Sequence, residues 1–197
     1  MRKSIWVRIL TCMLLLVLMT TVVSAASLEE KKQEVRQKTA DTLKRLYEKQ
    51  PSAEKAIANA AGYAVFFNTG YKLGIFGSSH GRGMAVNNTT GEEAFMRMKE
   101  FQAGLGLGVK EYSVIFVFGN DEVWEDFVNA GWEFGGNATA SADDGVNGDS
   151  LQGSLVVAPG IWMYQMTTKG LALELAVRGT NYYRDHDFDD PADGGKK

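Results

Sequence analysis

Few side chains in this chain could carry out catalytic chemistry. It contains two histidines, His80 and His186, and one cysteine, Cys12, in 197 residues. Ser78 and Ser79 adjoin His80, but neighbours in sequence rarely point at one another, and no nucleophile-elbow motif surrounds them. Catalysis needs a nucleophile, a base and a group that orients them. The sequence therefore predicts a protein that is not an enzyme.

A set of aspartates near the carboxyl end has the spacing of calcium ligands. Asp185, Asp187 and Asp189 stand at alternate positions, as in a calcium-binding loop. Position six of such a loop requires glycine, and here it is Asp190; position twelve requires glutamate, and here it is Lys196. A solvated acidic tail without a metal site is the favoured interpretation, and weak calcium binding is the alternative.

Two glycine-rich stretches could bring backbone close to a ligand. In residues 77–83, glycines could let successive N–H groups converge on an anion, and Arg82 adds a permanent charge. A phosphate or headgroup site is one interpretation, but a hairpin turn explains the same residues and is favoured. In residues 104–108, alternate glycines predict a tightly curved sheet or a helix against bare backbone. No helix follows as a dinucleotide site would require, so we expect no cofactor.

The basic residues near the start of the chain lie on a predicted helix. Ser27 and Glu30 form a capping box, and apolar residues then recur near helical spacing until Pro51. Residues 26–51 are therefore predicted to be an amphipathic helix. Its polar face could be solvated while the apolar stripe packs on the domain, which is the favoured interpretation. Alternatively, the basic side chains could reach phosphate headgroups while the stripe enters a membrane interface.

The rest of the chain predicts an α+β fold. The sheet should be mostly antiparallel and strongly curved or barrel-like, with the amphipathic helix before it and one or two further short helices. Asp121 is the expected cap of the later helix and Gly131 its end. The predicted helices are 52–61 and 121–130, and the predicted strands are 63–67, 84–86, 95–101, 112–118, 155–157, 161–166 and 171–177.

The first 25 residues have the three-part pattern of a secretion signal. Basic residues precede an apolar run at 9–23, and small residues at 24–26 follow it. Cleavage after Ala25 or Ala26 would remove the cysteine and three basic residues, which changes the net charge from −3 to about −6. Such an acidic balance argues against nucleic acid as a partner. The mature protein is expected to be periplasmic or secreted, with possible peripheral attachment to the membrane.

Loose motifs from residue 53 to residue 184 occur in one characteristic order. They are the alanine-rich stretch 56–61 leading into 62–67, then Lys72, Gly74, Gly77 and 81–83, Phe101 with the glycine-alternating strand, the helix around Phe127, Gly135 and Gly136, 169–171 and 181–183. In this order the chain resembles the SYLF domain, also called the Ysc84 domain. The expected organisation is a signal peptide at 1–25, a helix at 26–51, a SYLF-like domain at 52–186 and an acidic disordered tail at 187–197.

The resemblance implies a non-enzymatic domain that binds phospholipid, with phosphoinositides as the eukaryotic ligands and an amphipathic N-terminal segment at the bilayer. An exported protein would not meet phosphoinositides, so another anionic phospholipid or an envelope component is expected. Each basic residue contributes on the order of 1 kcal/mol near an anionic surface, so several must act together. The candidate lipid-binding residues are Lys31, Lys38, Arg45, Lys55, Lys72 and Arg82.

A second function class remains open. The basic and acidic residues of the first helix repeat every seven positions, which also suits pairing with a second helix. The alternative is therefore a periplasmic structural or protein-interaction module that oligomerises through this helix.

Overall fold

The computed structural model describes residues 28–134, 151–167, 170–172 and 179–188. The expected signal peptide lies outside them. The chain divides into two compact units, residues 1–34 and residues 35–197. Residues 28–49 are helical and are called the N-terminal helix below, and the boundary between the units falls within it. The described part of the first unit is the helical segment 28–34, and the features that follow belong to the second unit.

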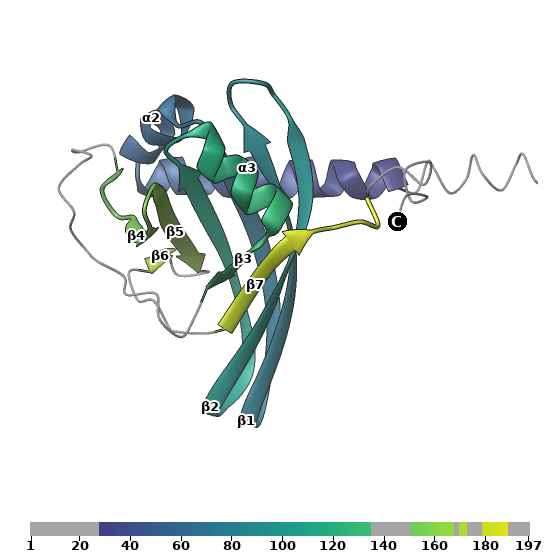
Figure 1. Cartoon of the computed structure of the whole chain (residues 1–197). Coiled ribbons are helices and arrows are strands. Elements are labelled where there is room, and N and C mark those ends of the chain that lie inside the picture. The colour runs from purple at the N-terminus through teal and green to yellow at the C-terminus, as the bar shows by residue number, and fades with distance from the viewer. Residues whose placement is uncertain (1–27, 135–150, 168–169, 173–178, 189–197) are drawn as a thin grey trace, which may run out of the picture. The chain divides into compact units, whose positions relative to one another are not determined.

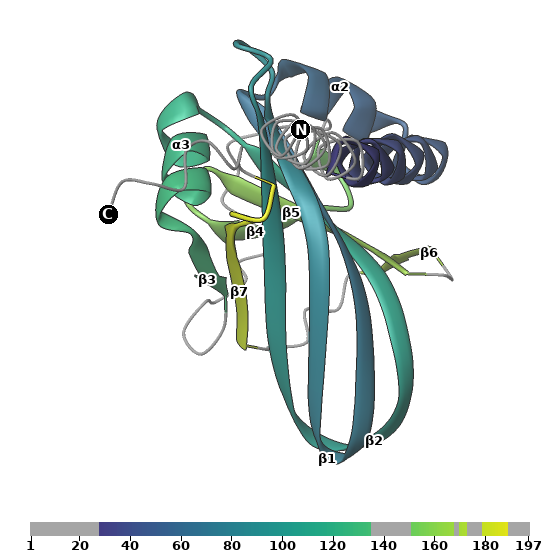
Figure 2. The ribbon, with the colours of Figure 1, turned by 90° about the vertical axis from the view of Figure 1, so that its right-hand side faces the viewer.

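The second unit is built on an antiparallel sheet (Figures 1 and 2). Its strand order is β3-β7-β2-β5-β4, with β1 paired to β2 and β6 paired to β5. One half of β2 pairs with β7 and the other half with β5. The strands are β1 (Gly62–Asn87), β2 (Glu93–Phe118), β3 (Trp132–Phe134), β4 (Leu155–Ala158), β5 (Ile161–Thr167), β6 (Gly170–Ala172) and β7 (Gly179–Arg184).

The long ribbon of β1 and β2 curves so strongly that the two halves of β1 lie side by side (Figure 2). A Cβ atom at Gly83 would lie 2.1 Å from the carbonyl oxygen of Val65, and one at Gly81 would lie 2.4 Å from that of Phe67. Glycine is therefore required there by the close approach of backbone. The expected hairpin turn at residues 77–83 is wrong, because this segment is extended strand within β1.

The curved ribbon also joins strands that the sequence separates. Segments 63–67 and 84–86 belong to one strand, β1, and segments 95–101 and 112–118 belong to β2. Glycine weakens the sequence signal of a strand, but here it permits curvature without ending the strand. The α+β fold with a curved, mostly antiparallel sheet is confirmed.

Both faces of the sheet are covered, which explains the continuous apolar run in β2. Phe66 and Phe116 belong to one core, which includes Phe127 of helix α3 (Asp121–Ala130). Val65 and Ile115 belong to a second core, beneath the N-terminal helix and helix α2 (Ser52–Asn59). Adjacent strand residues point to opposite faces, so a strand covered on both sides must be apolar at every position.

Side chains fix the ends of the two short helices. Asn120 accepts a hydrogen bond from the Val123 N–H at 2.9 Å, so Asn120 caps α3 rather than Asp121, which was expected. Asp121 instead accepts a hydrogen bond from the Asn87 amide at 3.1 Å. Gly131, at φ 73°, ends α3 as predicted. The cap lies one residue earlier because the extended backbone of residue 120 lets its side chain reach the N–H of Val123 in the first turn of the helix.

The apolar stripe of the N-terminal helix is packed on the domain over residues 35–49. Val35, Leu43 and Leu46 are buried, and the two leucines belong to the second core. The packing interpretation of this helix is therefore confirmed for these residues. The stripe cannot also enter a membrane interface unless the helix first leaves the sheet.

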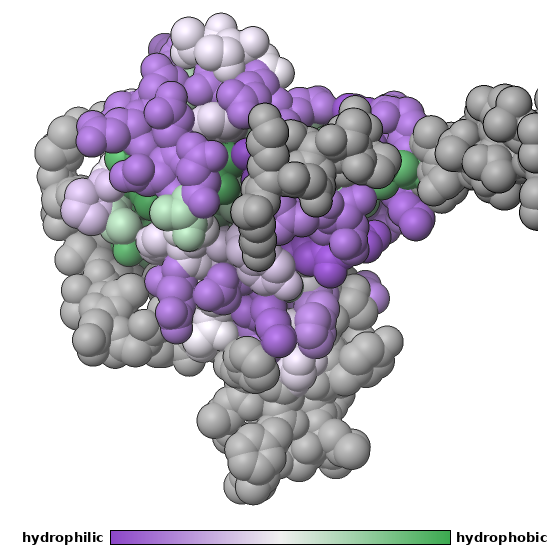
Figure 3. Space-filling view, turned by 45° about the vertical axis from the view of Figure 1, so that its right-hand side comes forward, coloured by the Kyte–Doolittle hydropathy of each residue, from purple (hydrophilic) through white to green (hydrophobic). Residues whose placement is uncertain are grey.

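Figure 3 shows one face of the molecule, on which the described residues are largely hydrophilic. Tyr183, at 38% exposure, is the one large hydrophobic side chain classed as exposed within these residues. Among the helices that the structure describes, none combines the length and the apolar character needed to cross a bilayer.

Candidate functional site

A cavity of about 390 Å³ lies between the N-terminal helix and the sheet, wholly within the second unit. Its volume is in the range of small-ligand sites, roughly 300–1,000 Å³. The helix forms one wall, and strands β1, β2 and β5 form the other. The lining residues are Lys38, Asp41, Thr42, Arg45, Phe67, Asn68, Glu111, Tyr112, Ser113, Met166 and Thr167.

The helix wall of the cavity alternates in charge. Lys38, Asp41 and Arg45 are spaced by three and four residues, which places them on one helix face. All three side chains are exposed. Arg45 donates a long hydrogen bond of 3.4 Å to the Thr167 carbonyl, and Gln37 donates to Asp41 at 3.1 Å. The guanidinium of Arg45 is thus held beside β5 at the edge of the cavity.

The sheet wall combines apolar groups with one more carboxylate. Phe67 is half-buried and Met166 is buried, whereas Glu111, which lies within β2, is exposed. Thr42 and Ser113, each with a hydroxyl group, also line the cavity. A ligand here would meet charged groups at the rim and an apolar surface further in.

The structure brings together two of the six predicted lipid-binding residues, Lys38 and Arg45, at the cavity. Lys31 is exposed on helical segment 28–34 of the first unit, and Lys55 is exposed on α2. Lys72 belongs to β1, but its side chain lies outside the described part of the chain. The role of these residues in lipid binding remains a prediction.

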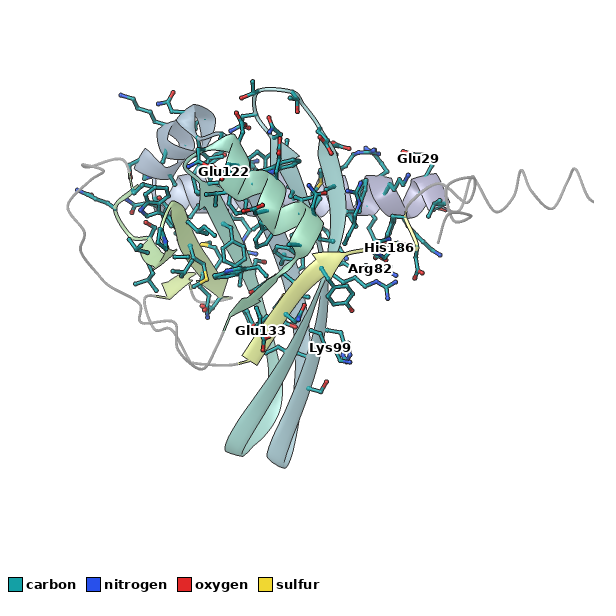
Figure 4. All side chains as sticks on the ribbon, in the orientation of Figure 1. Glu29, Arg82, Lys99, Glu122, Glu133 and His186 are labelled. Carbon is teal, nitrogen blue, oxygen red and sulfur yellow. The ribbon has the colours of Figure 1, made fainter. Side chains whose placement is uncertain are left out.

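Arg82, the sixth predicted residue, is engaged within the domain. Its Nε atom lies 3.6 Å from Asp185 Oδ2, and its guanidinium lies 5.1 Å from the centre of the Phe188 ring. Figure 4 shows the labelled Arg82 beside the end of β7. Arg82 therefore helps to hold the residues that follow β7.

The first of the acidic residues after β7 is buried, so the acidic segment does not begin as a solvated tail. Asp185 is 1% exposed, and its Oδ1 lies 2.7 Å from Nε of Arg97, which also pairs with Asp187. The hydrogen bond and charge of Asp185 are the main reasons that the pKa of Arg97 is raised. Phe188 is buried and stacks on Phe95, so packing continues past the expected boundary at 187.

Ser79 and His80 do not form a catalytic pair. Ser79 is buried and accepts a hydrogen bond from the Asn68 amide at 2.9 Å, whereas His80 is exposed. Adjacent residues of a strand point to opposite faces, which accounts for their separation. Within the described residues, no group of histidine, cysteine, aspartate and glutamate could hold a metal ion.

Sequence reasoning missed the acidic members of the cavity, Asp41 and Glu111. Asp41 is part of the seven-residue charge repeat of the predicted helix, but only its nearness to β2 and β5 makes it part of a site. Glu111 lies just before the apolar run of β2. It is seventy residues from Asp41 in the sequence, so the sequence does not show that both residues line one cavity. A charged residue just before the apolar run of a buried strand is the only signal that could have drawn attention to Glu111.

Comparison with known proteins shows which proteins this chain is similar to. Residues 99–192 match the family model Ysc84, described as "Las17-binding protein actin regulator". Over 152 residues the chain is 36% identical to "Beta cell expansion factor A" of Aeromonas veronii, which covers 76% of this chain and 56% of that relative. In these matches the chain is similar to the Ysc84 family, also called the SYLF family. It spans little more than half the length of this curated relative.

Proposed function

We propose that this chain is a non-enzymatic phospholipid-binding protein that associates peripherally with membranes outside the cytoplasm. The observation that carries this proposal is the cavity on which Lys38 and Arg45 converge from one helix face. A phospholipid offers a phosphate for the two cations and an apolar portion for Phe67 and Met166. Both parts of the cavity would then be used.

The two cations have complementary abilities. Arg45 can hold a phosphate with two parallel hydrogen bonds, and Lys38 contributes a compact charge on a flexible stem. The held position of Arg45 beside the Thr167 carbonyl reduces the freedom that it would lose on binding. The description of the matched family names a protein, Las17, as a partner of relatives. The volume and mixed polarity of the cavity favour a small headgroup over a protein segment.

Peripheral attachment agrees better with the described surface than deep insertion. The apolar stripe at Val35, Leu43 and Leu46 is already buried, and exposed large hydrophobic side chains are scarce in the described residues. Attraction would come instead from headgroup contacts and from the surface potential acting on Lys38 and Arg45, with Lys31 and Lys55 as further contributors. The ligand surface is thus an anionic phospholipid membrane.

The compartment is part of the proposal. The signal-like pattern in the first 25 residues supports export, and the residues of the mature protein include no cysteine. A phospholipid of the cell envelope would be the ligand that an exported protein meets. Self-association through the N-terminal helix is the alternative prediction.

Vesicle co-sedimentation of the protein without residues 1–25 tests this proposal. We expect binding that increases with the fraction of phosphatidylglycerol and decreases with added salt, because salt screens the exposed cations. Circular dichroism should first establish that the protein is folded. Absence of binding to vesicles of every composition would contradict the proposal.

A further inference from the structure

The charges that line the cavity cancel one another. Lys38 and Arg45 supply two positive charges, and Asp41 and Glu111 supply two negative charges. For Asp41, Arg45 and Glu111, the described part of the chain shows no ion pair within 4 Å. The lining therefore combines positive and negative groups instead of forming a single basic patch. The sequence alone did not predict that these positive and negative side chains line the same cavity.

A ligand that carries only a negative charge would satisfy half of this site. Its phosphate could contact Lys38 and Arg45, but Asp41 lies between these two residues on the same helix face. Asp41 is about one helical turn from each of them, or roughly 4.5 and 6 Å along the helix axis. The phosphate would therefore lie close to a carboxylate, and like charges repel at this distance. A positive group on the ligand would remove this repulsion.

We propose that the cavity selects a zwitterionic headgroup in which a phosphate diester is joined through a short spacer to a primary ammonium group. This inference rests on the phospholipid-binding function proposed above and names its headgroup. The phosphate is held by Lys38 and Arg45, and the ammonium group lies between Asp41 and Glu111. The short spacer separates the two charges by about the rise of one helical turn, which matches the alternation on the helix.

The acceptors in the cavity favour a primary ammonium over a quaternary one. The carboxylates of Asp41 and Glu111 accept hydrogen bonds, as can the hydroxyl groups of Thr42 and Ser113. A primary ammonium donates three such bonds, whereas a trimethylated one donates none and is usually held by a cage of aromatic rings. Here Phe67 and Tyr112 are the aromatic residues of the lining. Phosphatidylethanolamine is therefore the matching membrane lipid, and phosphatidylcholine is the matched non-binding comparison.

The decisive experiment compares two sets of vesicles that share one constant fraction of phosphatidylglycerol. The remaining lipid is phosphatidylethanolamine in one set and phosphatidylcholine in the other. Charge-assisted hydrogen bonds to the ammonium predict an affinity for the first set that is about tenfold higher. Equal affinity for both sets would overturn the headgroup proposal. It would leave the proposed phospholipid-binding function intact, since that function fails only when no vesicle binds.

Charge-neutralising variants connect the preference to the cavity. The double variant Asp41→Asn and Glu111→Gln should lose most of the tenfold preference. The matched control, Glu48→Gln and Glu122→Gln, removes two exposed carboxylates that do not line the cavity and should keep the preference. If the Asp41 and Glu111 variant keeps the preference, the preference arises from bilayer packing and not from the cavity. That result would overturn the proposal.

A soluble probe identifies the source of the headgroup. Glycerophosphoethanolamine and glycerophosphocholine are titrated into isotope-labelled wild-type protein, and nuclear magnetic resonance reports on the residues of the cavity. Binding of the first alone would support a site that also accepts the free headgroup. Binding of neither, with the vesicle preference present, would support a site for the lipid in its bilayer. Stronger binding of the choline compound would contradict the proposal.

Discussion

Gly83 shows at the residue scale how the sheet is allowed to curve. It lies in an extended part of β1, so its role is not to adopt a left-handed conformation. An added Cβ would lie 2.1 Å from the backbone oxygen of Val65, which cannot move away as a flexible side chain could. Position 83 therefore has room for backbone alone.

We expect Gly83→Ala to lower the free energy of unfolding by at least about 1–3 kcal/mol, the usual cost of overpacking. Gly179→Ala is the matched control, because a Cβ at Gly179 would meet no atom within 4 Å. Urea unfolding followed by circular dichroism measures both. Equal stability of the two variants would show that the two halves of β1 do not approach as closely as described.

Asp185 is the residue that fixes the segment after β7. Asp185→Asn keeps the size of the side chain but removes the buried charge that faces Arg97 and Arg82. We expect a loss of about 1–3 kcal/mol, which is less than for a fully buried pair because both arginines are partly exposed. Asp187→Asn, at a side chain 73% exposed, should change stability by less than about 0.5 kcal/mol. Thermal unfolding in low salt compares them, and equal effects would contradict this role of Asp185.

Single residues were predictable when their role is local. The sequence indicated Lys38 and Arg45 because a helix repeat brings them to one edge of a stripe. It could not indicate Glu111, whose role depends on β2 lying beside the helix. It also misassigned Asp185, because alternating aspartates resemble a solvated tail and the partners Arg82 and Arg97 are far away in the sequence.

At the scale of elements, the N-terminal helix is held by aromatic as well as aliphatic packing. Tyr47 packs against the second core, to which Tyr164 of β5 belongs. Burial is the main cause that raises the pKa of each to about 12. An unfolded tyrosine has a pKa near 10, so folding favours the neutral form of both.

Because the folded pKa is the higher one, the stability from these tyrosines is complete below about pH 10 and is lost as pH rises from about 10 to 12. Tyr47→Phe removes one of the two titrations. The stability of this variant relative to wild type should therefore increase between about pH 9 and pH 11. Urea unfolding at both pH values measures it, and a constant difference would show that Tyr47 does not titrate as expected.

Elements with clear end signals were predicted closely, and the long strands were not. The later helix begins and ends within one residue of its prediction, because Asn120 and Gly131 provide local caps. Strands β1 and β2 were divided at glycines, since glycine usually marks a turn. In this sheet, the reason for glycine at Gly81 and Gly83 is contact with a distant part of the same strand, which has no local signal.

At the scale of the whole molecule, the two faces of the sheet in the second unit carry different structures. One sheet face carries the core with α3, and the other carries α2 and the N-terminal helix with the cavity at its side. The resemblance to the Ysc84 family and the curved α+β architecture could be read from the order of motifs and from composition. The balance of charges in the cavity required the structure, because it joins three residues of the N-terminal helix with Glu111 of β2.

The most direct test of the account is vesicle binding of the double variant Lys38→Ala and Arg45→Ala. Its control, Lys44→Ala and Lys49→Ala, also removes two exposed positive charges from the same helix, at positions that do not line the cavity. At about 1 kcal/mol for each cation, the first variant should bind phosphatidylglycerol vesicles about 30-fold more weakly than wild type. The control should retain most of the binding. Equal weakening in both variants, or none in either, would contradict a phospholipid site at this cavity.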